Sequence, residues 1–216
     1  MRFADRADAG RRLAHALHSY CDRDPVVLAL PRGGLPVAAE IASALAAPLD
    51  IVLVRKIGVP WQPELATGAL VEGEPPIVAR NEAVISAAGI DERAFETARR
   101  RALAKLEDAR RRLVGDRPRA TIAGRAAILV DDGVATGATA RAALQSIRAL
   151  GAKTLTLAVP VASFEALAAL KREVDDLVCL TAPARFCAVS AFYADFHQIE
   201  DEEAVAILAR FSAAAR

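Results

Sequence analysis

Short apolar runs alternate along the chain with stretches of helical periodicity. The runs are expected to form buried strands and comprise residues 26–30, 51–54, 126–130, 154–159 and 177–181. Helices are expected at residues 9–20, 36–46, 138–150 and 163–172. Uninterrupted apolar strands separated by helices are typical of a parallel sheet that is covered on both faces. The pattern therefore predicts an α/β fold with a central parallel sheet of about five strands flanked by helices.

A long excursion, residues 57–120, interrupts this alternation. Its first part, residues 58–76, is rich in proline and glycine, so a flexible loop is predicted there. Its second part, residues 91–114, has an apolar stripe at helical spacing and is predicted to be a helix. We expect one domain over residues 1–216, with this excursion and a small hood formed by residues 183–216.

Composition narrows the class of protein. Hydrophobic residues make up 54% and charged residues 25%, so the chain is not a disordered one. The 28 Lys and Arg nearly balance the 27 Asp and Glu, which argues against nucleic acid as the main partner. The helix at 91–114 is arginine-rich, which indicates either a solvated face or a surface for a phosphate-rich partner.

Cysteine usage and the N-terminal residues bear on location. Cys21, Cys179 and Cys187 are too widely spaced for a disulfide framework or a zinc site. The charged N-terminal stretch lacks the apolar segment of a signal peptide, and no apolar run reaches the roughly 18 residues of a membrane span. We therefore expect a cytoplasmic protein with no membrane partner.

Charged and flexible residues follow three consecutive predicted strands. They are Arg32, Gly33 and Gly34 after the first strand, Arg55 and Lys56 after the second, and Asp131 and Asp132 after the third. Because ligands bind beyond the carboxyl ends of parallel strands, this edge of the sheet is the predicted site.

The most informative stretch runs from Asp131 to Thr139. Two carboxylates end a buried strand, and a short loop then opens a helix, whose N-terminus suits a phosphate group. Thr136 and Thr139 add hydroxyl donors, and Gly137 allows close approach of the backbone. A sugar phosphate with free hydroxyls fits both halves of the site. No Walker A loop, GxGxxG or GxSxG motif offers a rival interpretation.

This stretch resembles the signature of type I phosphoribosyltransferases for 5-phosphoribosyl-1-pyrophosphate (PRPP). The shared pattern is an apolar strand, two acidic residues, a few small or apolar residues and Thr-Gly-x-Thr. A less specific resemblance extends from Phe3 to the C-terminus. Over this length the chain is similar to bacterial phosphoribosyltransferase-domain proteins whose acceptor is not established. The resemblance implies a Mg²⁺-dependent transfer of the 5-phosphoribosyl group from PRPP to a purine or pyrimidine base, with release of pyrophosphate.

The resemblance also implies roles for individual residues. Asp131 and Asp132 would bind the ribose hydroxyls and Mg²⁺, directly or through water. The 5-phosphate cradle would comprise Ala135, Thr136, Gly137, Ala138 and Thr139. The pyrophosphate would be bound by Arg32, Gly33, Gly34, Arg55 and Lys56, with a strained peptide near Arg32 and a mobile loop after Lys56. In the hood, Phe192, Tyr193 and Asp195 would contact the base, although the aromatic rings could equally form a small C-terminal core.

One departure from the family pattern leaves alternatives open. Purine 6-oxo enzymes of the family have an acidic residue at the position of Ala135, which alanine cannot replace as a proton shuttle. Glu64 or Glu72 would then supply the catalytic carboxylate. A regulatory protein that senses PRPP or a nucleotide is the alternative function, and a hydrolase or phosphorylase acting on sugar phosphates is a third. Many members of the family are dimers, so a homodimer is also expected.

Overall fold

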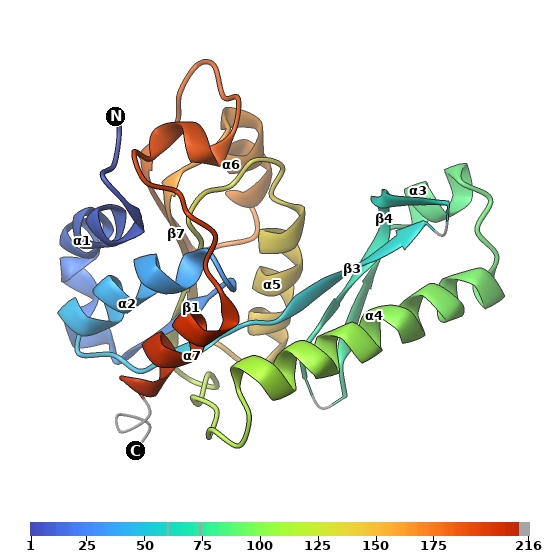
Figure 1. Cartoon of the computed structure of the whole chain (residues 1–216), viewed down its shortest axis with the longest axis horizontal. Coiled ribbons are helices and arrows are strands. Elements are labelled where there is room, and N and C mark those ends of the chain that lie inside the picture. The colour runs from blue at the N-terminus through green and yellow to red at the C-terminus, as the bar shows by residue number, and fades with distance from the viewer. Residues whose placement is uncertain (60, 74, 212–216) are drawn as a thin grey trace. The chain divides into compact units, whose positions relative to one another are not determined.

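The computed structural model describes residues 1–59, 61–73 and 75–211, and the chain clusters into two compact units (Figure 1). The core unit comprises Met1–Val52 and Arg117–Arg216, and the inserted unit comprises Leu53–Asp116. The inserted unit accounts for most of the excursion that the sequence predicts at residues 57–120.

A five-stranded parallel sheet forms the centre of the core unit, in the order β2-β1-β6-β7-β8. Its strands are β1 (Pro25–Ala29), β2 (Leu49–Ile51), β6 (Ala126–Val130), β7 (Thr154–Val161) and β8 (Asp176–Thr181). Every residue of β1, β2 and β6 is buried, as expected of strands covered on both faces. The predicted α/β fold with a parallel sheet is confirmed.

Helices precede, connect and follow these strands. They are α1 (Arg6–Ala16), α2 (Gly34–Ala44), α5 (Ala138–Ala149), α6 (Phe164–Leu170) and α7 (Asp201–Ala209), with 3₁₀ turns η1 (His18–Arg23) and η2 (Val189–Phe192). The first helix begins earlier than predicted because Asp5 caps it, accepting a hydrogen bond from the Asp8 N–H. Ser163 caps α6 in the same way, as its sequence position predicts. Within the described residues, no helix is long and apolar enough to cross a membrane.

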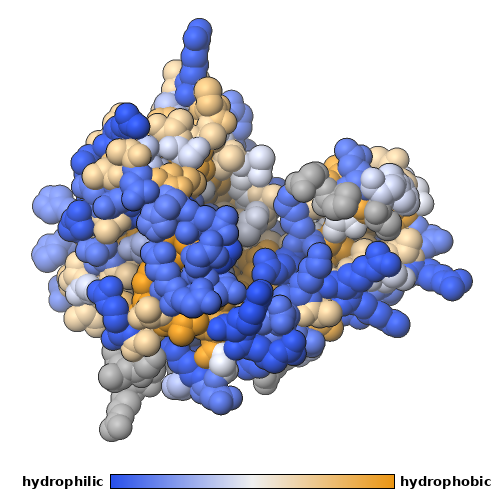
Figure 2. Space-filling view, viewed as in Figure 1, coloured by the Kyte–Doolittle hydropathy of each residue, from blue (hydrophilic) through white to orange (hydrophobic). Residues whose placement is uncertain are grey.

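The inserted unit combines an antiparallel sheet with two helices. Strands β3 (Val54–Val59), β4 (Gln62–Val71) and β5 (Ile77–Arg80) pair in that order, and α3 (Glu82–Ala87) and α4 (Glu92–Leu113) follow. The predicted helix at 91–114 is confirmed, and Phe95, Leu106 and Leu113 of its apolar stripe are buried. Hydrophilic side chains line its opposite face (Figure 2).

The predicted loop at residues 58–76 is wrong, because most of this segment lies in β3 and β4. Proline and glycine content suggested a loop, but Gly68 lies inside β4 because the neighbouring strand passes very close. A Cβ atom added there would lie 2.4 Å from the Ala79 carbonyl oxygen. Leu70 and Val71, which point to opposite faces of β4, are both fully buried, so the strand is covered on both faces at this end.

A buried carboxylate fastens the returning chain to the core unit. Asp50, on β2, is only 1% exposed. Its side chain accepts hydrogen bonds from Arg117 at 3.1 Å, from Arg119 at 2.9 Å and from the Ala120 N–H at 2.8 Å. Two arginines thus compensate one buried negative charge at the point where the chain re-enters this unit.

Candidate active site

Asp131 and Asp132 lie directly after β6, as the sequence predicts. The Asp132 N–H donates to Asp131 Oδ1 at 2.9 Å, and Arg6 Nε donates to Asp132 Oδ2 at 2.8 Å. Burial, with the neighbouring Asp132 charge adding to it, raises the pKa of the Asp131 carboxyl well above its usual range. Burial also raises the pKa of Asp132, and the ion pair with Arg6 opposes that shift. The strand end thus carries two carboxyl groups in different surroundings.

Arg6 is the site residue that the sequence does not reveal. It lies on α1, 126 residues from Asp132, and is 7% exposed. Besides contacting Asp132, it donates from Nη1 to the His197 carbonyl oxygen at 2.8 Å and lies 3.8 Å from the centre of the Phe196 ring. In the sequence it looks like the surface arginines that follow on the same helix, so only tertiary packing distinguishes it.

The loop between the carboxylates and α5 is held in one shape by its neighbours. Ser163 Oγ donates to the Ala135 carbonyl oxygen at 2.7 Å, and the Val134 N–H donates to the Val161 carbonyl oxygen at 2.9 Å. Gly137, the N-cap residue just before α5, has a φ of 78°, a left-handed conformation that favours glycine. The residues around it, Thr136, Ala138 and Thr139, are exposed. This loop therefore presents an open helix N-terminus beside hydroxyl groups, which suits a phosphate.

The loop after β1 packs directly against the carboxylates. A Cβ atom added at Gly33 would lie 2.2 Å from Asp132 Oδ2, and one at Gly34 would lie 2.7 Å from the Val130 carbonyl oxygen. The peptide bond between Pro31 and Arg32, in this same loop, is cis. The Arg32 guanidinium lies 3.2 Å from Glu200 and 3.3 Å from Asp201. The first and third predicted clusters are thus brought together in the core unit.

The second predicted cluster belongs to the inserted unit. Strand β2 ends at Ile51, and Arg55 and Lys56 belong to β3 of the inserted unit, so the prediction that they follow the second sheet strand is wrong. The apolar run at 51–54 does not continue as a strand through Val52 and Leu53, and the chain passes there into the other unit. The pyrophosphate-binding role of Arg55 and Lys56 stays a prediction.

The two candidate loop carboxylates also belong to the inserted unit. Glu64 lies on β4, and its side chain is outside the described part of the structure. Glu72 forms an ion pair at 3.1 Å with Arg110 of α4. A catalytic role for either carboxylate stays a prediction.

The hood segment contains a small aromatic cluster. Tyr193 is 3% exposed, packs against Phe3 and Phe196, and donates from its hydroxyl to the Asp132 carbonyl oxygen at 2.5 Å. Phe192 is half-buried and stacks on Phe186. Tyr193 thus belongs to a small buried core, which is the structural role that the sequence offers as the alternative for these aromatic rings. The base contacts predicted for Phe192, Tyr193 and Asp195 stay predictions.

Exposed charged groups lie at the end of the hood segment. Asp195 is exposed, and its carboxylate lies 3.2 Å from His197 Nδ1. Glu203 lies 3.4 Å from the other nitrogen of the same imidazole. The imidazole's hydrogen bond to the Asp195 carboxylate, and then that to the Glu203 carboxylate, raise the pKa of His197 above its ordinary value.

Asp131 and Asp132 offer carboxylate oxygens to a divalent cation. Aspartate oxygens are the hard donors that Mg²⁺ prefers. Across residues 1–59, 61–73 and 75–211, no group of three or more His, Cys, Asp and Glu side chains is placed to hold a metal ion. Mg²⁺ commonly takes one or two carboxylates and completes its shell with water and substrate phosphates. Asp131 and Asp132 therefore fit Mg²⁺ that also binds the oxygens of a sugar pyrophosphate, and this metal stays a prediction.

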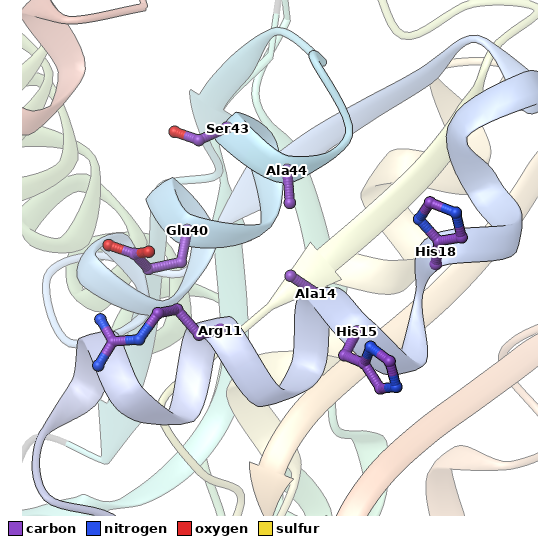
Figure 3. Close-up of a pocket in the computed structure, with 7 residues that line it drawn as sticks. All are labelled: Arg11, Ala14, His15, His18, Glu40, Ser43 and Ala44. Carbon is purple, nitrogen blue, oxygen red and sulfur yellow. The ribbon is translucent and has the colours of Figure 1, made fainter.

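An open pocket lies away from these residues, between α1 and α2 of the core unit (Figure 3). It is lined by Arg11, Ala14, His15, His18, Glu40, Ser43 and Ala44. Figure 3 shows Arg11 and His15 projecting from α1 and Glu40 from α2. Because this pocket contains none of the predicted site residues, we treat it as separate from the candidate active site.

The parallel sheet, the carboxylate pair and the glycine loop before α5 define the class of protein as a type I phosphoribosyltransferase fold. The family model that describes the phosphoribosyl transferase domain matches residues 3–190 of this chain. The chain therefore belongs to the phosphoribosyl transferase domain family, as the signature at 131–139 indicates.

Individual relatives agree with this family. A Mycobacterium tuberculosis protein named "Putative phosphoribosyl transferase" is 46% identical over 208 residues, which are 96% of this chain and 46% of the relative. The chain thus spans about half the length of the curated relatives it matches. A crystal structure of TT1426 from Thermus thermophilus is 43% identical with a TM-score of 0.86, covering 98% of this chain and 99% of that one.

A more distant likeness carries no argument about the acceptor. The purine phosphoribosyltransferase of Pyrococcus horikoshii is 16% identical with a TM-score of 0.47, covering 90% of this chain and 93% of that one.

Proposed function

We propose that this chain transfers the 5-phosphoribosyl group of PRPP to a nitrogenous base and releases pyrophosphate. The observation that carries the proposal is the juxtaposition, in one compact unit, of a carboxylate pair and an open helix N-terminus. The first suits the hydroxyls of a ribose, and the second suits its 5-phosphate. Membership of the phosphoribosyl transferase domain family supports the same ligand.

Each group of the core unit has a task in this reaction. The loop from Ala135 to Thr139 binds the 5-phosphate through backbone N–H groups and threonine hydroxyls. Asp131 and Asp132 accept hydrogen bonds from the ribose hydroxyls and so orient the sugar. As the bond from C1 to pyrophosphate breaks, positive charge develops on the ring, much as in glycoside cleavage. Nearby carboxylates stabilise that charge.

Departure of pyrophosphate requires positive charge near its oxygens. Arg32, on the loop that packs against Asp132, is the core-unit cation in the predicted pyrophosphate position. Arg32 is already paired with Glu200 and Asp201. The pyrophosphate must therefore displace these carboxylates or share the Arg32 guanidinium with them. Bound Mg²⁺ would supply further positive charge for the leaving group. The backbone N–H of Gly33 lies in the same loop and is the expected neutral donor, whereas the N–H of Gly34 donates to the Leu30 carbonyl oxygen at 3.0 Å.

Calorimetric titration with PRPP in the presence of Mg²⁺ tests the proposal, followed by a panel of purine and pyrimidine bases scored by pyrophosphate release. Saturable binding with release on one base supports a transferase and identifies its acceptor. Binding without release on any base favours the PRPP-sensing alternative. Absence of PRPP binding by the folded protein would refute the assignment of the 131–139 loop.

Two matched substitutions connect the result to the site. Asp132→Asn removes one charge of the carboxylate pair and is expected to weaken PRPP binding or turnover by at least roughly tenfold, since hydrogen bonds to charged groups contribute about 1.5–3 kcal/mol. Asp22→Asn makes the same chemical change at an exposed position after α1 and is expected to have no effect. Equal activity of the two variants would contradict the proposal.

A further inference from the structure

One guanidinium joins three segments of the core unit that are distant in the sequence. Arg6 belongs to α1, its Nε donates to Asp132 after β6, and its Nη1 donates to the His197 carbonyl oxygen in the hood segment. The Cζ atom of the guanidinium also lies over the Phe196 ring of that segment, 3.8 Å from its centre. Each contact uses a different part of the fork, so the side chain has little freedom to reorient.

The ion pair is more costly than its structural task requires. The side chains of Arg6 and Asp132 are only 8% and 14% exposed, so both charges lose much of their hydration. A pair of apolar side chains could hold α1 against the end of β6 at least as well, because exchanging a buried ion pair for apolar packing is often neutral or stabilising. The charge is retained at one of the two carboxylates to which we assign the ribose.

A second arginine on the same helix shows the contrast. Arg12 is 44% exposed and pairs with Asp8, one helical turn earlier, at 2.8 Å. That pair is local to α1 and exposed to solvent, where such pairs contribute little. Arg6 therefore differs from its neighbour in burial, in its partner and in the number of segments it joins.

We infer that Arg6 is a positioning residue for the ribose-binding carboxylate and fastens the hood segment to it. By holding Asp132 Oδ2, it sets the orientation in which the rest of the carboxylate meets the sugar. The hood is tied to the same point, because Tyr193 donates to the backbone carbonyl of Asp132 and Arg6 donates to that of His197. This inference rests on the ribose-binding role proposed above for Asp132.

Substitution of Arg6 is expected to damage recognition of the ribose hydroxyls in particular. Arg6→Gln removes the charge and most of the fork, whereas Arg6→Lys keeps the charge but contacts one partner at a time. We expect Arg6→Gln to lower PRPP affinity in the presence of Mg²⁺ by roughly 10- to 100-fold. Arg6→Lys should recover part of this loss, and Arg12→Gln should bind as the unsubstituted chain does.

A purely structural role is distinguished with sugar phosphates that lack one hydroxyl. Ribose 5-phosphate, 2-deoxyribose 5-phosphate and 3-deoxyribose 5-phosphate are titrated against each variant, and thermal unfolding confirms that each is folded. If Arg6 positions the carboxylate, the preference for ribose 5-phosphate over at least one deoxy compound falls in Arg6→Gln. If Arg6 only holds the fold together, all three affinities fall in the same proportion.

The outcomes separate this inference from the proposed function. Binding of PRPP by the unsubstituted chain, together with an unchanged hydroxyl preference in folded Arg6→Gln and Arg6→Lys, would overturn the positioning role and leave the function standing. If Arg6→Gln does not fold, Arg6→Lys decides, since it keeps a positive charge beside Asp132. An unsubstituted chain that binds none of these sugar phosphates would overturn the proposed function and the inference together.

Discussion

Substitution of Gly33 by alanine is expected to separate ligand binding from stability. Its φ of −59° and ψ of −35° are open to any residue, so alanine brings no backbone strain. The added Cβ atom would, however, lie 2.2 Å from Asp132 Oδ2, whereas ordinary contact begins at 3.4 Å. The carboxylate oxygen must therefore move by about 1.2 Å, which follows from these two distances.

The size of the effect follows from what that movement breaks. Arg6 Nε lies 2.8 Å from the same oxygen, and a bond of this kind is lost beyond roughly 3.2 Å. A hydrogen bond to a charged group contributes about 1.5–3 kcal/mol to stability. Replacing glycine by alanine adds about 0.4–1 kcal/mol of stability, because it lowers the conformational entropy of the unfolded chain. We expect a net loss of about 1–2 kcal/mol in stability and at least roughly tenfold in PRPP affinity.

Two further glycine variants serve as comparisons in denaturant unfolding and PRPP calorimetry. Alanine at Gly34 would meet the Val130 carbonyl oxygen at 2.7 Å, a backbone atom that cannot rotate away, so a larger stability loss of about 3 kcal/mol is expected. Alanine at Gly124, which has a φ of 77° and no neighbour within 4 Å, should cost about 1 kcal/mol with unchanged affinity. Unchanged PRPP affinity in Gly33→Ala would refute the reasoning.

Three other predictions follow from charged groups of the core unit. Asp50→Ala leaves two arginines without their buried carboxylate and should cost about 3–5 kcal/mol in denaturant unfolding. Asp108→Ala in the inserted unit, whose two arginine ion pairs are exposed, should cost little. Glu200→Gln should increase pyrophosphate affinity several-fold, because it removes one competitor for Arg32; unchanged affinity in a titration would argue against Arg32 as the binding group. His197 has its pKa raised in the folded state, so the stabilisation by its two carboxylate neighbours is fully present below about pH 6.5 and is lost as pH rises through the folded value. The difference in Tm between the unsubstituted chain and His197→Gln should therefore be present below about pH 6.5 and shrink as pH rises through the raised folded-state pKa, and a difference that grows with pH would contradict this.

Several features of this protein could be predicted from local sequence alone. The predicted strands at 26–30 and 126–130 are continuous apolar runs, which are stable only when both faces of the strand are buried. The observed β1 and β6 lie within one residue of these predicted bounds. The helix at 138–150 and the serine cap at 163 depend on short-range periodicity and hydrogen bonding, which sequence records directly. Asp131 and Asp132 follow β6 immediately, so their position at the sheet edge required no knowledge of distant contacts.

Other features depend on packing between distant segments. The sheet of the inserted unit was hidden by its prolines and glycines, because the reason for Gly68 is a neighbouring strand that only the folded chain brings close. Arg55 and Lys56 were expected after a core strand, but the chain enters another compact unit just before them, and apolar patterning does not mark that boundary. Local pattern thus determined the elements of the core and the carboxylates that end β6. Which arginine lies against Asp132, and which glycine loop leaves room for it, was decided by tertiary structure, because these contacts join segments that have no local interaction with one another.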